Sequence, residues 1–181
     1  MKRNSSLSLS AFAALAASLL LAGPASAAMN GMSTSNGQDA TFVTQAAAGG
    51  MAEISEAHLA EKNGSGAKVK AFAQRMIADH TKADDQLMAI VKKDGFTAPS
   101  GIGPTNEAMM SKLQGMTGSS FDTAYLSGQI AGHEKMEALF KQEIASGKNP
   151  DLVAFAKNTL PVVEEHLALA KTDNGSSSSS M

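Results

Sequence analysis

The 181-residue chain contains no cysteine and no tryptophan, and its aromatic residues are seven phenylalanines and one tyrosine. The absence of cysteine excludes disulfides and thiol chemistry, so packing alone must stabilise the fold. Methionine, of which the chain has eleven residues, is suited to filling gaps in a core that has few large rings. In an exported protein, thioether sulfurs are also possible ligands for Cu(I).

The chain also has no large excess of basic or of acidic residues. Fifteen basic and seventeen acidic residues leave a formal net charge of −2, which gives neither a basic face for nucleic acid nor a polybasic membrane patch. The sequence has no serine-nucleophile motif, no phosphate-binding glycine loop and no dinucleotide-binding fingerprint. We therefore expect no nucleic-acid partner, and no nucleotide-dependent enzyme class is indicated.

The first 27 residues have the organisation of a secretory signal peptide. Lys2 and Arg3 form a positive start, residues 7–22 form an apolar core, and residues 25–27 form a small-residue cleavage site. The apolar run is too short and too rich in alanine for a membrane span. We predict an exported protein, periplasmic or outer-membrane-associated, with no transmembrane segment in the mature chain.

The rest of the chain divides into three parts by composition. Residues 28–37 are small and polar, which is typical of a flexible leader. Residues 38–172 carry apolar residues at helical spacing and show no strand pattern, so they are expected to form one all-α domain. Residues 173–181 include five consecutive serines and are expected to be a disordered tail.

The periodicity predicts four long helices and one short helix, separated by glycine- and proline-containing breaks. Their approximate ranges are 39–62, 67–94, 104–113, 121–145 and 151–171. Asp39 can cap the first helix, and Asn149 with Pro150 can cap and begin the last. Tight turns join the long helices in two antiparallel pairs, and a long connection holding the short helix links the pairs. We predict a ferritin-like four-helix bundle with a short helix in the crossover, and plain up-down-up-down connectivity is the alternative.

Each long helix carries one histidine. His58 lies near the end of the first helix and is expected to face water. The other three, His80, His133 and His166, lie on apolar stripes at similar depths in their helices. Glu53 lies at a similar depth in the first helix. These four side chains are therefore expected to meet at one level in the middle of the bundle, where helix bundles build their sites.

The spacing around these histidines differs from that of a di-iron bundle, in which glutamate precedes histidine by three residues on two helices. The residues at that spacing here are Ile77, Ile130 and Val163, none of which can bind a metal. Three imidazoles and one carboxylate could instead hold a single Zn, Fe, Mn or Cu ion. They could also form a structural polar network, or carry acid–base catalysis without a metal.

Other carboxylates lie near the histidines in sequence. Asp84 follows His80 by one helical turn, and Glu137 follows His133 by one turn, so either could orient a ring or join the site. Asp79 and the remaining nearby acids point further round their helices, and we expect them to be solvated.

Segments of all four long helices match one family in the same order. The matching runs are FVTQAAAGGMAEISEAHLA, VKAFAQRMIADHTKADDQL and FDTAYLSGQIAGHEKMEALFKQEIASGKNPDLVAFAKNTLPVVEEHL. In these runs the chain resembles the bacterial domain-of-unknown-function 4142 family. The resemblance implies a ferritin-like bundle in exported bacterial proteins, described as periplasmic or outer-membrane, without an established activity. The positions carried over are Glu53, His80, His133, Pro161 and His166.

Three functions remain open at this point. The first is an exported bundle that binds one transition-metal ion. The candidate metal ligands are Glu53, His80, His133 and His166. The second is a ferritin-like redox enzyme that uses this ion, and the third is an envelope stress or interaction protein whose buried histidines are structural. The sequence identifies no partner and no oligomeric state.

Overall fold

The computed structural model describes residues 37–178, which form five α-helices and no strand. The helices are α1 (Gly37–Asn63), α2 (Ala67–Asp94), α3 (Pro104–Gln114), α4 (Gly118–Ser146) and α5 (Pro150–Ser178). The all-α prediction is therefore confirmed. The predicted signal peptide and the leader up to residue 36 lie outside the described residues.

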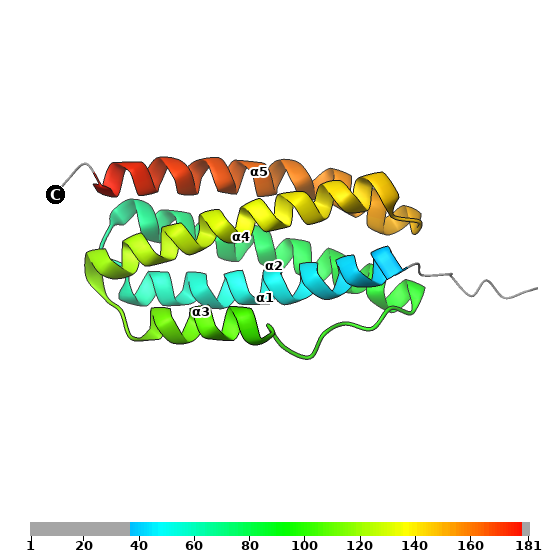
Figure 1. The fold of residues 1–181 in the computed structure, drawn as a ribbon, viewed down its shortest axis with the longest axis horizontal. Coiled ribbons are helices and arrows are strands. Elements are labelled where there is room, and N and C mark those ends of the chain that lie inside the picture. Colours follow the sequence, from blue (N-terminus) through cyan, green and yellow to red (C-terminus); the bar gives the residue numbers. More distant parts are fainter. Residues whose placement is uncertain (1–36, 179–181) are drawn as a thin grey trace, which may run out of the picture. The chain divides into compact units, whose positions relative to one another are not determined.

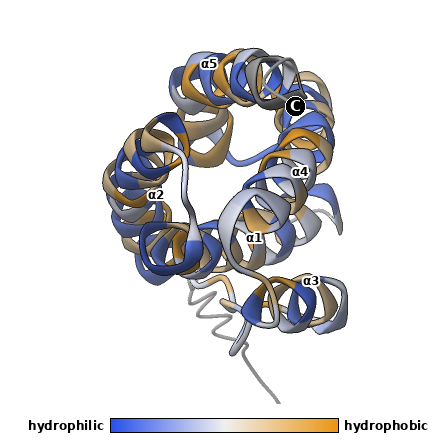
Figure 2. Ribbon diagram, turned by 90° about the vertical axis from the view of Figure 1, so that its left-hand side faces the viewer, coloured by the Kyte–Doolittle hydropathy of each residue, from blue (hydrophilic) through white to orange (hydrophobic). Residues whose placement is uncertain are grey.

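The four long helices lie side by side as a bundle, and the short α3 packs outside it (Figure 1). α1 pairs with α2 and α4 pairs with α5, while α1 also contacts α4 and α2 contacts α5. The view along the bundle shows these four helices around a common core, with α3 against α1 (Figure 2). The connection through α3 runs back along the bundle, so α4 begins at the same end as α2 (Figure 1). This is the predicted ferritin-like crossover, and the up-down-up-down alternative is excluded.

Helix ends mostly follow the predicted signals. α2 ends at Asp94 and is capped by Gly95, whose φ of 74° suits a residue without a side chain and whose N–H donates to the Val91 carbonyl. α5 extends to Ser178, past the predicted end near residue 171, so the first part of the predicted disordered tail is helical. Residues 179–181 of that tail lie outside the described residues. None of the helices within residues 37–178 combines the length and the apolar character that a membrane span requires.

The apolar core consists of two clusters. One cluster lies where α1 ends and where α2 and α4 begin, and it contains Phe72, Phe121 and Tyr125. The other lies at the opposite end and contains Phe42 and Phe140, whose ring centroids are 5.0 Å apart, and other apolar side chains. Between the two clusters the bundle buries a layer of histidine, glutamate and glutamine side chains. This polar layer is the candidate functional site.

Candidate metal centre in the middle of the bundle

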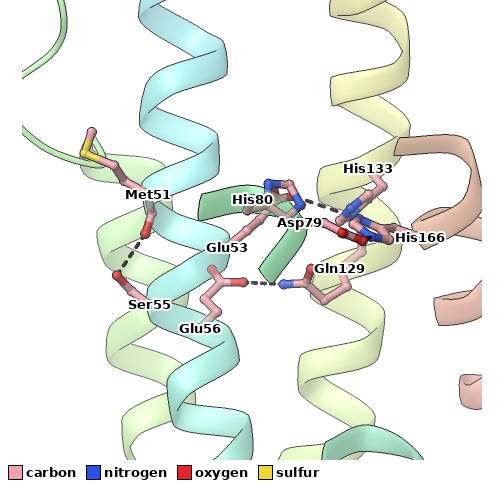
Figure 3. A network of polar contacts seen from close by, with 9 residues as sticks. All are labelled: Met51, Glu53, Ser55, Glu56, Asp79, His80, Gln129, His133 and His166. Atoms are coloured by element: carbon pink, nitrogen blue, oxygen red, sulfur yellow. Dashed lines mark hydrogen bonds and ion pairs between the residues drawn. The ribbon is translucent and has the colours of Figure 1, made fainter. Parts of the chain in front are cut away.

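The polar layer brings together the four residues that the sequence singled out (Figure 3). The side chains come from four different helices, and their exposed fractions are 7% for Glu53, 8% for His80, 0% for His133 and 1% for His166. The three imidazole centroids are 5.4–5.8 Å apart. One nitrogen of each ring lies within 4.8 Å of a nitrogen of each other ring. The predicted convergence is confirmed, and binding of a metal stays a prediction. His58 is exposed, as expected.

Glycines make room for the carboxylates of this layer. A Cβ atom on Gly132 would lie 3.5 Å from Oε1 of Glu53, so the α4 backbone approaches this carboxylate closely. A Cβ atom on Gly50 would lie only 2.2 Å from Oδ1 of Asp84, so a larger residue there would displace Asp84. These glycines, one on α1 and one on α4, therefore leave room for acidic side chains as well as allowing helices to approach.

Each imidazole has an oxygen close to one of its two nitrogens. Nδ1 of His133 lies 2.9 Å from the Gln129 carbonyl oxygen, and Nε2 of His166 lies 2.9 Å from Oδ2 of Asp79. Nδ1 of His80 lies 3.2 Å from Oε2 of Glu53, a close contact without the geometry of a hydrogen bond. Because the Gln129 carbonyl and the ionised Asp79 can only accept, the hydrogen of a neutral ring belongs on Nδ1 in His133 and on Nε2 in His166.

The second nitrogen of each ring has no partner. These atoms are Nε2 of His80, Nε2 of His133 and Nδ1 of His166, and none has a hydrogen-bond partner among the described residues. With the hydrogen on the opposite nitrogen, the unpartnered nitrogens of His133 and His166 carry free lone pairs. Buried polar atoms rarely lack partners, because their desolvation is then uncompensated. Three clustered rings, each with one buried nitrogen that lacks a partner and an oxygen near the other nitrogen, provide the donor type and the outer support of a histidine metal site.

The protonation states of the rings suit this role. Burial and the neighbouring histidines lower the pKa of His80 to about 3. Burial also lowers the pKa of His133 to about 4, and it lowers the pKa of His166 although Asp79 opposes the shift. All three rings are therefore neutral near pH 7, which is the form that binds a metal.

Glu53 lies against the rings on the side of their Nδ1 atoms. Its carboxylate oxygens are 3.2 Å from Nδ1 of His80 and 3.4 Å from Nδ1 of His133. Burial raises the pKa of Glu53 well above its ordinary value, and the nearby Glu56 and Asp84 raise it further. The carboxyl group is thus placed to orient two rings rather than to face their unpartnered nitrogens.

The sequence misplaced two acids around the site. Asp79 was expected to be solvated, but it accepts the hydrogen bond from His166 and also pairs with Arg75 at 3.3 Å. Burial raises the pKa of Asp79, but these two partners outweigh burial and leave the pKa below its ordinary value. Glu137 was a candidate to orient a ring, yet it forms an ion pair with Lys141 instead. Asp84, the other candidate, does border the site.

Gln129 and Glu56 also belong to the polar layer, and the sequence did not predict them as members of the site. Nε2 of Gln129 donates to Oε2 of Glu56 at 2.7 Å, and both side chains are buried. Burial raises the pKa of Glu56 to about 7, and the bond from Gln129 opposes the shift. The signal was available, because Glu56 follows Glu53 by three residues and Gln129 precedes His133 by four, which places each pair on one helix face.

Comparison with known proteins gives a family and a fold. A family model described as "Domain of unknown function (DUF4142)" matches residues 22–172. Among solved structures, the chain is similar to the crystal structure of a DUF305 fragment from Deinococcus radiodurans, with a TM-score of 0.69 and 14% identity. That match covers 78% of this chain and 97% of the other, and at this identity it supports the fold alone. No curated protein matches the chain.

Proposed function

The chain belongs to the DUF4142 family, whose function is not assigned, and we propose that it binds one transition-metal ion on His80, His133 and His166. One observation carries the proposal. Three buried rings from three helices lie close enough for one nitrogen of each to hold a shared ion, and each ring has one nitrogen that lacks a partner. A metal ion would supply the missing partner to all three atoms at once.

The donor atoms narrow the choice of metal. Three neutral imidazoles suit Zn²⁺, Cu²⁺ or Fe²⁺, whereas Mn²⁺ is better matched by carboxylate and carbonyl oxygen. A metal on three histidines keeps a further coordination position open, as catalytic zinc sites do. We propose that Glu53 orients His80 and His133 rather than binding the ion directly. Its proton would be released on metal binding, because the charge of the ion favours the carboxylate.

Two other functions compete with metal binding. A purely structural network would be favoured by full pairing of its polar atoms, and the unpartnered nitrogens argue against it. A redox enzyme would need a redox-active metal, and the open position permits one without indicating it. We also propose export to the periplasm or outer membrane, which the signal-like pattern of residues 1–27 supports.

Metal analysis of the protein purified without an affinity tag tests the proposal. We expect one equivalent of bound metal and a rise in melting temperature when Zn²⁺ is added. His133→Ala should abolish both effects, because it removes a donor. His58→Ala is the matched control, since it deletes an exposed histidine of α1 and should leave binding unchanged. Less than about a tenth of an equivalent of Zn, Cu, Fe or Mn, with no thermal shift, would contradict the proposal.

A separate experiment tests whether the protein is a redox enzyme. Oxygen consumption after Fe(II) is added to the metal-free protein would indicate an enzyme, and stable binding without consumption would indicate a binding protein. His133→Ala and His58→Ala serve again as the variant and the control.

A further inference from the structure

A buried metal site needs a path for the ion. The unpartnered nitrogens of the three histidines are inaccessible to solvent, yet two cavities extend into the polar layer from different sides. One, of about 240 Å³, opens between α2 and α5 and is called here the α2/α5 pocket. The other, of about 440 Å³, lies between α1, α3 and α4 and is called here the α1/α4 pocket.

The two pockets reach different residues of the site. The α2/α5 pocket is lined in part by His80 and His166. The α1/α4 pocket reaches Glu53 and its surroundings but none of the three rings. It is also bordered by α3, whose Met109 side chain packs against Gly128 of α4. An ion in the α2/α5 pocket therefore lies beside two of its three proposed ligand residues, and an ion in the other pocket lies beside none.

The α2/α5 pocket also contains an acid without a partner. Its charged side chains, apart from the histidines, are Asp79, Lys82 and Asp84. The Asp79 carboxylate already accepts a hydrogen bond from His166 and forms an ion pair with Arg75. Asp84 makes no hydrogen bond or ion pair within the described residues; it is half-buried against Gly50, one helical turn after His80.

We propose that the α2/α5 pocket is the access route for a divalent cation, and that Asp84 receives the ion before it passes to the histidines. The inference rests on the proposed function. A carboxylate in a partly enclosed, largely apolar pocket attracts cations more strongly than one on an open surface, because low-dielectric walls focus its field. Gly50 contributes by leaving room for the Asp84 carboxylate beside α1.

Stopped-flow absorption with Co(II) alone, mixed with metal-free protein, tests the route. We expect Asp84→Asn to slow uptake by about tenfold at low ionic strength while one equivalent is still bound at the end. The difference should shrink as salt is raised, because screening weakens attraction by the carboxylate. Glu107→Gln makes the same chemical change on α3, the helix that borders the α1/α4 pocket, at an exposed side chain outside both pockets, and should leave the rate unchanged.

Bulky substitutions test the route independently of charge. Thr159→Phe narrows the α2/α5 pocket and should slow uptake, whereas Ala131→Phe places the same ring at the α1/α4 pocket and should not. Slowing by Ala131→Phe alone would assign entry to the other face, and equal rates in all variants would show that neither pocket limits uptake. Either result overturns the route while the metal site stands. Failure of the wild-type protein to take up Co(II) would instead overturn the proposed function and this inference together.

Discussion

Two groups of buried polar side chains in this bundle are constructed differently. The polar layer in the middle contains the three histidines. A second group, called here the turn cluster, lies where the α4–α5 turn meets the start of α1 and contains Asp39, Glu143 and Asn149. Asp39 accepts hydrogen bonds from the backbone N–H groups of Lys148, at 2.8 Å, and Asn149, at 3.2 Å.

The turn cluster is almost fully satisfied. The Asn149 side chain accepts from the N–H groups of Asp151 and Leu152, both at 3.0 Å, and it donates to Asp94 at 2.8 Å. One oxygen of Glu143 lacks a partner there, whereas the polar layer has three unpartnered ring nitrogens as well as unpartnered oxygens of Glu53 and Gln129. The difference indicates that the turn cluster holds helices together, and that the polar layer is completed by something it binds.

The largest expected effect comes from breaking the turn cluster. Asp39→Ala would leave two backbone N–H groups without their acceptor, each costing about 1–3 kcal/mol. We expect the free energy of unfolding of the metal-free protein to fall by about 4 kcal/mol, measured by urea denaturation. Replacing a histidine of the polar layer, as in His133→Leu, should cost less, because it also removes an unpaired polar atom. A larger loss for His133→Leu would reverse the assignment of the two groups.

The second-largest expected effect is the loss of stabilisation by Zn²⁺ when a histidine of the polar layer is replaced. At a free Zn²⁺ concentration of about 100 times Kd, binding should stabilise the wild-type protein by about 2.7 kcal/mol. His166→Ala should lose this increment, measured as the difference between unfolding with Zn²⁺ and with a chelator. Asp39→Ala should retain it despite its lower stability. If both variants lost the increment, the two groups would be energetically coupled and the division between them would fail.

A third prediction uses the one incompletely paired member of the turn cluster. Burial raises the pKa of Glu143 from 4.5 to about 7, with Asp39 adding to the shift and Gln38 opposing it. The folded state therefore keeps a proton that the unfolded state has lost. This contribution to stability is complete below about pH 4.5 and disappears as pH rises through 7.

Glu143→Gln isolates this contribution, because glutamine resembles the protonated acid at every pH. Relative to the variant, the wild-type protein should lose about 2 kcal/mol between about pH 5 and pH 7 in the presence of a chelator. Exposed Glu164→Gln is the control and should give a flat difference. A difference between the wild-type protein and Glu143→Gln that stays flat over this range would mean that Glu143 is already ionised in the fold at pH 5.

The sequence predicted the depth of the site better than its surroundings. His80, His133 and His166 could be placed at one level because the rise of an α-helix is fixed and the turns are short. Asp79 precedes His80 by one residue and therefore points about 100° away. Whether that direction leads to water or to His166 depends on where α5 packs, which the sequence of α2 does not reveal.

Long-range partners explain the other misses. Asp39 was expected to cap its own helix, but α1 begins at Gly37 and the carboxylate binds the turn before α5, more than a hundred residues away in sequence. Asn149 was predicted as the cap of α5, and this is confirmed, because its partners are two and three residues ahead. Local hydrogen bonds could be read from the sequence, and those that depend on helix packing could not.

The smallest expected effect is the difference between alanine substitutions at Gly132 and at Gly50, the two glycines that border the polar layer. A methyl group on Gly132 would meet Glu53 at an ordinary contact distance of 3.5 Å, so Gly132→Ala should add up to about 1 kcal/mol of helix stability without changing metal binding. The same change at Gly50 would force Asp84 away, because its Oδ1 lies 2.2 Å from the new carbon. Gly50→Ala should therefore gain less stability and slow Co(II) uptake, whereas Gly132→Ala should leave uptake unchanged. Equal uptake rates for the two variants would mean that the position of Asp84 does not matter for access, and the polar layer would then need only its histidines to acquire a metal.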